Sequence, residues 1–213
     1  LAEGECIGET LERMQDEQLR SLRTGSELSS ALREAFRDSG VNLVSPTMNG
    51  VGLLGMDDAT HAGRVRYDLA RWQAHFDAVP WLRKATSPTE ARRIVNDGDV
   101  GVVMNVQNLG RAIEGDPDEI EVLHNAGIRI AQLTYNAQNL VGTGCTDRSS
   151  GGLSDHGVEA VRRLNDRDMI VDLSHCGRET TLDAIEVSAD PVACTHTFCA
   201  AIADHDRGKS DEE

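Results

Sequence analysis

The chain has 213 residues, of which 39% are hydrophobic and 27% charged, a composition typical of a soluble globular protein. Its formal charge of −15 argues against nucleic acid and anionic membranes as partners, because both would repel it. No run approaches the roughly 18 consecutive apolar residues of a membrane helix, and the acidic start lacks the features of a signal peptide. Five cysteines without a Cys-x-x-Cys pair favour free thiols, so we expect a cytoplasmic protein.

The first part of the chain predicts helices and one strand behind a polar N-terminal extension, residues 1–24. Thr24 and Glu27 have the spacing of a capping box, and Gly40 provides a helix end. The predicted elements are a polar helix over 8–22, a helix over 28–38, a strand over 41–47 and a helix over 58–78.

The rest of the chain alternates short apolar runs with helical stretches. Two helices open with the same signal, a capping residue followed by proline and then glutamate, at Ser87 and at Asp116. Gly98 and Gly127 end these helices, and Ser154 caps a third. The predicted strands cover 100–106, 128–134, 169–174 and 191–195, and the predicted helices cover 88–97, 117–126, 154–167 and 178–188.

This alternation predicts an α/β fold built from parallel βαβ units. We expect five consecutive strands of a (β/α)₈ TIM barrel with the helices outside, whereas an open doubly wound sheet is the alternative that strand order would reveal. Because eight strands typically need about 250 residues, we expect residues 1–213 to form a single, incomplete barrel domain. Unpaired strand edges would then favour a homo-oligomer; a shortened, self-sufficient domain is the alternative.

Polar residues follow the predicted strands at the point where each strand ends. Gln107 follows the strand over 100–106, and Tyr135 and Asn136 follow that over 128–134. His175 and His196 follow the last two strands. Because the carboxyl ends of parallel strands lie on one side of a sheet, these side chains are expected at one face, where barrel enzymes place their chemistry.

Two of these residues predict a metal site. Neighbouring parallel strands are about 4.8 Å apart, so the imidazoles of His175 and His196 can reach one ion. Strand alternation places Val171 and Leu173 on the face of His175, with apolar residues filling the barrel beneath. The alternative is that both histidines only hydrogen-bond to loop carbonyls.

Other kinds of chemistry are less well supported by the sequence. His75 and Asp77 form a His-x-Asp triplet, but it lies in a predicted helix, where residues two apart diverge. A Schiff-base enzyme needs a lysine at a strand end, and neither Lys84 nor Lys209 is predicted there. Cys145 lies in a glycine-containing loop that could reach the site. The remaining histidines expected on the helical surface are His61, His124 and His156.

Three segments carry a family resemblance. They read GIRIAQLTYNAQNLVGTGC, GGLSDHGVEAVRRLNDRDMIVDLSHCG and PVACTHTFCAAIADHDRGKSDEE. Gly-Leu-Ser before a helix, then Asp-Leu-Ser-His, then Thr-His about twenty residues on, resembles the membrane (renal) dipeptidase family. The resemblance covers residues 127–213 and extends more weakly back to Leu28 through GVVMNVQN.

The resemblance implies a zinc hydrolase with a binuclear site that cleaves dipeptides or related small amides. By position, His175 and His196 match two histidines that hold one metal, and Arg207 matches an arginine that binds the substrate carboxylate. Tyr135, with Asn136 beside it, stands where many members have a substrate-binding histidine, and Gln107 stands where they have the bridging glutamate.

The departures from the family pattern limit what the chain is expected to do. A neutral Gln107 brings no charge to a bridge between two dications, and no strand carries a His-x-Asp pair. We therefore expect one zinc ion at most, held by His175, His196 and Gln107, and no catalytic residue is assigned. The other function left open is that of a non-catalytic relative that binds a small carboxylate through Arg207.

Overall fold

The computed structural model describes residues 27–48 and 61–213. Within them the helices are α2 Glu27–Ser39, α3 His61–Ala78, α4 Pro88–Asn96, α5 Leu109–Ala112, α6 Glu119–Ala126, α7 Asp155–Asp166 and α8 Arg178–Val187. The strands are β1 Leu43–Val44, β2 Thr47–Met48, β3 Leu82–Lys84, β4 Val100–Val102, β5 Met104–Val106, β6 Ile128–Gln132 and β7 Ile170–Asp172.

All pairs among the described strands are parallel, and the main sheet follows chain order. Its four strands lie in the order β2-β5-β6-β7, and a parallel bridge from Asp172 to Ala193 continues the order. A second sheet has the order β1-β4-β3. The main sheet, whose strands lie in chain order, confirms the α/β fold with consecutive parallel strands. In the second sheet β3 departs from chain order, because it pairs with β4 and not with β1.

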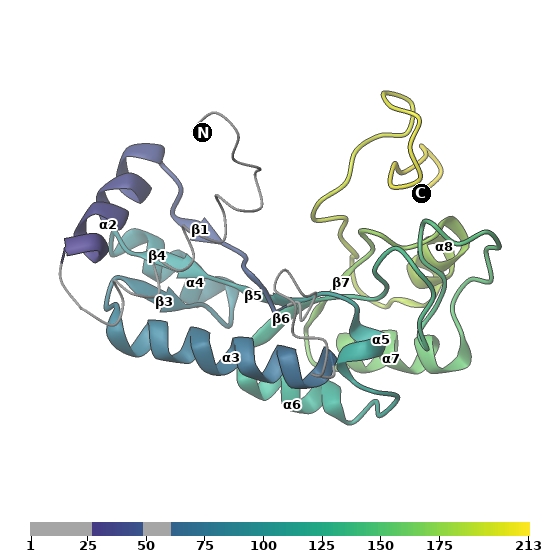
Figure 1. Ribbon diagram of the computed structural model, residues 1–213, viewed down its shortest axis with the longest axis horizontal. Helices are drawn as coiled ribbons and strands as arrows, with labels where there is room; N and C mark the ends of the chain where they lie inside the picture. Colours follow the sequence, from purple (N-terminus) through teal and green to yellow (C-terminus); the bar gives the residue numbers. More distant parts are fainter. Residues whose placement is uncertain (1–26, 49–60) are drawn as a thin grey trace, which may run out of the picture.

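Helices α3, α6 and α7 lie along one side of the strands (Figure 1). Between strands and helices lies a continuous apolar core that includes Val106, Ile128, Leu133 and Leu164, all fully buried. Trp72 and Phe76 pack together on α3 with ring centroids 5.7 Å apart, as their spacing predicts. The sheet is thus fixed from one side, and its strand ends are left for the site.

Two of the three predicted helix starts act as expected, whereas the helix predicted to open at Asp116 begins only at Glu119, after Asp118. The Ser87 and Ser154 hydroxyls accept hydrogen bonds from the backbone N–H groups of Glu90 and Gly157, which caps α4 and α7. Gly127 ends α6 with φ of +107°, a conformation that glycine adopts without steric cost. Because each capping motif is local, these helix boundaries could be read from the sequence.

Several strand predictions need correction. The expected strands over 41–47 and 100–106 are each broken, at Ser45–Pro46 and at Val103. The expected strand over 191–195 is reduced to the single bridge at Ala193. Strand β3 and the short helix α5 were not predicted, because three or four residues give no measurable periodicity. The predicted helix over 8–22 and the cap at Thr24 lie outside the described residues.

The correction at β3 also concerns the lysines. Lys84 is the last residue of this strand, contrary to the expectation that neither lysine ends one. Its ammonium group donates to Gln73 Oε1 and Ala126 O, on the helices α3 and α6. It therefore points away from the strand ends that carry the histidines, so a Schiff-base role remains unsupported.

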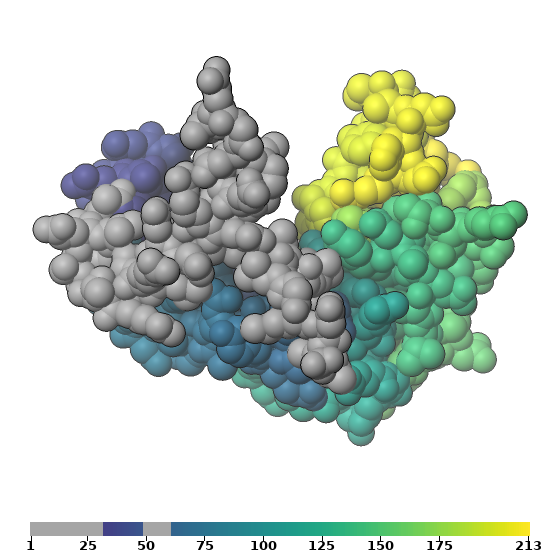
Figure 2. Space-filling model, viewed as in Figure 1, coloured from purple at the N-terminus to yellow at the C-terminus, as the bar shows by residue number. Residues whose placement is uncertain are grey.

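The C-terminal residues, yellow in Figure 2, project from the rest of the described chain. They run from the Ala193 bridge into a loop that is closed by a parallel bridge between Cys199 and Lys209. The loop is tied down by Lys209, whose ammonium group donates to Cys176 O and Thr181 Oγ1. Among the described helices, none is long and apolar enough to span a membrane.

Candidate metal and substrate site

The structure brings together the six residues that the sequence singles out. Gln107 follows β5, Tyr135 and Asn136 lie just beyond β6, and His175 lies just beyond β7. His196 follows the bridged residue Ala193, and Arg207 reaches it from the projecting loop. Parallel neighbouring strands place the first five of these groups at one edge of the sheet, and the loop adds Arg207.

His175 is buried and held on two sides. Its ring stacks on Tyr135 at 4.1 Å between centroids, and its Nδ1 lies 2.6 Å from Asn136 Oδ1. An amide oxygen can only accept, so Nδ1 carries the proton and Nε2 has the lone pair. Burial, with the charges of Arg207 and His196, lowers the pKa of His175 to about 4. The ring is therefore neutral at pH 7, which is the form that binds a metal.

His196 lies beside His175, with 5.0 Å between the two ring centroids. Its Nδ1 is 2.8 Å from Thr195 Oγ1, and its Nε2 is 3.2 Å from Gln107 Nε2 and 3.4 Å from Gln132 Nε2. Burial also lowers the pKa of His196. Two neutral imidazoles and two side-chain amides thus meet at one point.

His175 departs from the expected strand geometry. Strand β7 ends at Asp172, and His175 has φ of +64°, in the left-handed region. The alternation that groups His175 with Val171 and Leu173 therefore does not extend to it. Instead Asp172 lies on the histidine side, with Oδ2 3.8 Å from His196 Nδ1.

Arg207 and Cys145 border this cluster. Arg207 donates from Nη2 to His196 O at 2.8 Å, and its buried Nε has no hydrogen-bond partner. The guanidinium group thus keeps one unsatisfied donor, which is shielded from solvent beside His196. Cys145 Sγ lies 3.6 Å from Asn136 Oδ1, and burial raises its thiol pKa, so the thiol stays protonated.

Three neighbours of the cluster were missed by sequence reasoning. Gln132 and Asp172 are buried last residues of β6 and β7, paired in register, and each was read only as part of an apolar strand. His61 was expected on the surface; instead it is half-buried and its Nε2 lies 3.1 Å from Gln107 O. The available signal for the first two was a polar residue within an otherwise apolar run.

The donors can accommodate a metal ion only in part. Among the described residues, no group of three His, Cys, Asp or Glu side chains is placed to hold one. His175 and His196 supply two imidazoles, fewer than the three protein ligands of a usual catalytic zinc site. If the side-chain amide of Gln107 or Gln132 rotated by half a turn, its oxygen would face the site and could serve as a further neutral metal ligand. This donor set suits a single, weakly held ion.

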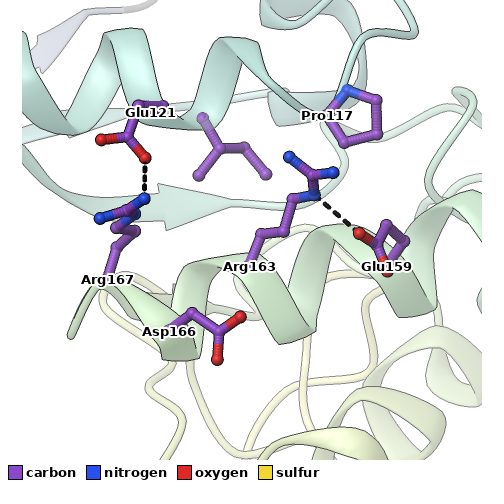
Figure 3. A pocket seen from close by; sticks show the side chains of 7 residues that line it. Pro117, Glu121, Glu159, Arg163, Asp166 and Arg167 are labelled. Atoms are coloured by element: carbon purple, nitrogen blue, oxygen red, sulfur yellow. Dashed lines mark hydrogen bonds and ion pairs between the residues drawn. The ribbon is translucent and has the colours of Figure 1, made fainter.

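A separate groove of about 230 Å³ lies between α6 and α7 (Figure 3), and none of the six site residues lines it. Its two arginines are already paired, Arg163 with Glu159 and Arg167 with Glu121. The arginines of the groove are therefore not left to bind an anion, and the strand-end cluster remains the candidate site.

Residues 14–213 match the family described as membrane dipeptidase, peptidase family M19. The chain belongs to the membrane dipeptidase family. The expected resemblance is thus confirmed over nearly the whole chain. Among curated members, dipeptidase verJ of Clonostachys rogersoniana is 29% identical over 133 residues, covering 62% of this chain and 34% of that protein. An uncharacterised dipeptidase of Schizosaccharomyces pombe is 33% identical over 115 residues, covering 53% of this chain and 28% of that protein.

Solved structures of related enzymes have a fold similar to that of this chain. An amidohydrolase from Pseudomonas aeruginosa is 32% identical with a TM-score of 0.74, covering 86% of this chain and 54% of that one. A metallopeptidase from Rhodobacter sphaeroides, bound to a phosphinate mimic of L-Ala-D-Ala, is 18% identical with a TM-score of 0.74, covering 91% and 66%. This member of the membrane dipeptidase family therefore has the family's barrel-like fold, and it spans about a third of the length of the curated relatives.

Proposed function

We propose that this site serves the metal-dependent hydrolysis of dipeptides or related small amides. The observation that carries the proposal is the pair of neutral imidazoles, 5.0 Å apart between centroids, whose Nδ1 atoms are both engaged by neighbours. Both rings would therefore bind a metal through Nε2, and the Gln107 and Gln132 amides would turn away from Nε2 of His196. Membership of the dipeptidase family and the likeness to metallopeptidase structures support the same activity.

His175 and His196 would hold one zinc ion, with Gln107 as a neutral third donor. A zinc ion bound there would polarise a carbonyl group or lower the pKa of a bound water. Arg207 would bind the substrate carboxylate through its guanidinium group. Tyr135 and Asn136 would line the substrate position while they hold the His175 ring. We assign the chain to the cytoplasm, with its described cysteines free.

A second candidate is a relative that binds a small carboxylate without catalysis. It is favoured by the neutral donor set: both Gln107 and Gln132 approach His196 with amide groups where a two-metal centre needs carboxylates. In that case Arg207 would supply the binding energy and no metal would be required.

An assay of a dipeptide panel, with and without added zinc, distinguishes the hydrolase from the non-catalytic carboxylate binder. The hydrolase predicts zinc-dependent turnover that falls at least tenfold in His175→Ala and in Arg207→Ala. Arg207→Lys, which keeps the charge but not the fork of donors, should retain part of the binding. Absence of turnover in every zinc-loaded sample, together with Arg207-dependent binding of a free amino acid, would contradict the hydrolase and support the second candidate.

A further inference from the structure

Asp172 is a buried carboxylate at the end of β7 that joins the two histidine segments. Only 3% of the residue is exposed. Its Oδ1 accepts from Ser174 N, Ser174 Oγ and Thr195 N at 3.0, 2.8 and 3.1 Å, and its Oδ2 accepts from Thr195 Oγ1 at 2.6 Å. Because a buried charge is costly unless hydrogen-bonded, this set of donors explains how the carboxylate is tolerated.

The direction of these hydrogen bonds determines where the His196 proton lies. Thr195 has one hydroxyl hydrogen, and the Asp172 carboxylate can only accept, so that hydrogen points to Oδ2. The Thr195 oxygen is left as an acceptor, and the group 2.8 Å away, His196 Nδ1, must donate to it. The neutral His196 ring therefore carries its one N–H proton on Nδ1.

The other side of the ring agrees with this assignment. The amide nitrogens of Gln107 and Gln132 both lie within 3.4 Å of His196 Nε2. An amide nitrogen donates and does not accept, so Nε2 must carry the lone pair. The lone pair of His196 thus lies on Nε2, as it does in His175.

We propose that Asp172 is a positioning residue that fixes the Nδ1–H tautomer of His196 through the Thr195 hydroxyl. Ser174 adds to the same arrangement, because its hydroxyl donates to Asp172 while accepting from the His196 backbone N–H at 3.0 Å. Hydrogen-bonded partners of this kind orient metal-binding histidines and raise their basicity. The consequence for zinc affinity rests on the proposed function, whereas the tautomer does not.

The tautomer can be read in the metal-free chain by nitrogen NMR on ¹⁵N-histidine-labelled protein. Wild type and Thr195→Ser, which keeps the hydroxyl, should carry the His196 proton on Nδ1. Thr195→Val removes the acceptor. Asp172→Asn lets the Thr195 hydroxyl turn towards the ring. Both should move a substantial fraction of the proton to Nε2. His175, whose Nδ1 is held by Asn136 at 2.6 Å, should not change and serves as the internal reference.

Zinc affinity gives the second readout. It should fall about tenfold or more in Thr195→Val and stay within a few-fold of wild type in Thr195→Ser. Because Thr195 is exposed, its variants should fold, and they test the proposal even if Asp172→Asn does not fold.

A His196 proton on Nε2 in wild type, or one that stays on Nδ1 in Thr195→Val, would overturn the proposal. The predicted tautomer shift without any zinc binding would uphold it while removing the proposed function. Zinc binding through His196, with a tautomer that does not change in the Thr195 and Asp172 variants, would uphold the proposed function and remove the positioning role of Asp172.

Discussion

At the scale of single residues, the site depends on left-handed backbone conformations that residues other than glycine seldom adopt. Asn108, Asn136 and His175 have φ of +59°, +58° and +64°. Each follows a strand, so the chain turns sharply and aims the side chain back over the sheet end. Such conformations cost on the order of 1 kcal/mol each and persist only where neighbours hold them. For Asn136 the neighbour is the backbone of Gly144.

Gly144→Ala should destabilise the chain and loosen the site together. A Cβ at Gly144 would lie 2.0 Å from Asn136 O and 2.2 Å from Asn136 C, which are backbone atoms, so the loop must shift. We expect a loss of about 1–3 kcal/mol in the free energy of unfolding, measured by urea denaturation, and weaker zinc binding because Asn136 holds His175.

Gly151→Ala is the matched control for this substitution. Its Cβ would meet only Thr143 Cγ2 at 3.4 Å, an ordinary contact, so stability should change little. Equal effects of the two substitutions would show that the packing of Gly144 against Asn136 is not what holds this loop.

The residues of the site could be predicted from the sequence, but their orientations could not. Gln107, His175 and His196 follow apolar runs, so a parallel sheet alone brings them together. Asp172 escaped notice because strand alternation placed it on the face opposite His175. The left-handed backbone of His175 reverses that assignment, and no pattern of residue types encodes such a torsion angle.

At the scale of elements, the start of α4 makes a pH-dependent prediction. Glu90 Oε2 accepts from Thr86 N and Thr86 Oγ1, both at 2.8 Å, and these hydrogen bonds hold the pKa of Glu90 below its ordinary value. A carboxyl group whose pKa is lower in the folded state stabilises the fold above its unfolded pKa. This contribution is lost as the pH falls through the folded pKa.

Glu90→Gln should therefore lower the free energy of unfolding by about 1 kcal/mol at pH 7. The difference from wild type should shrink as the pH falls below the ordinary pKa of a glutamate, which denaturation at a series of pH values will show. Glu186→Gln on α8 is exposed and should change little at any pH. A Glu90→Gln deficit that grows in acid would contradict the assigned hydrogen bonds.

The elements that could be predicted are those with local boundary signals. Ser87, Ser154 and Gly127 mark helix ends by their own chemistry. The breaks at Pro46 and Val103 depend instead on how neighbouring strands pair, and they are invisible within one strand. Strand β3 has three half-buried residues, and only its pairing with β4 identifies it as a strand.

At the scale of the whole molecule, the order of the strands predicts where the fold is most stable. Strands β5 and β6 are paired on both sides and belong to the main apolar core. Residues 201–206 lie in the projecting loop and are exposed. Among the described residues, amide hydrogen exchange should therefore be slowest in β5 and β6 and fastest in 201–206.

The exchange pattern also concerns the site, because Arg207 follows the exposed part of the loop whereas His175 is fixed to the core. Added zinc should slow exchange around His196 more than in β6, which is already protected. Protection of 201–206 equal to that of β6 in the zinc-free chain would contradict this division.

A calorimetric zinc titration tests most directly whether His175 and His196 form a metal site. We expect one ion per chain, bound weakly, with binding abolished in His196→Ala and kept in His156→Ala, whose histidine lies on α7 outside the cluster. A stoichiometry near two, or binding unchanged in His196→Ala, would show that the metal site lies elsewhere.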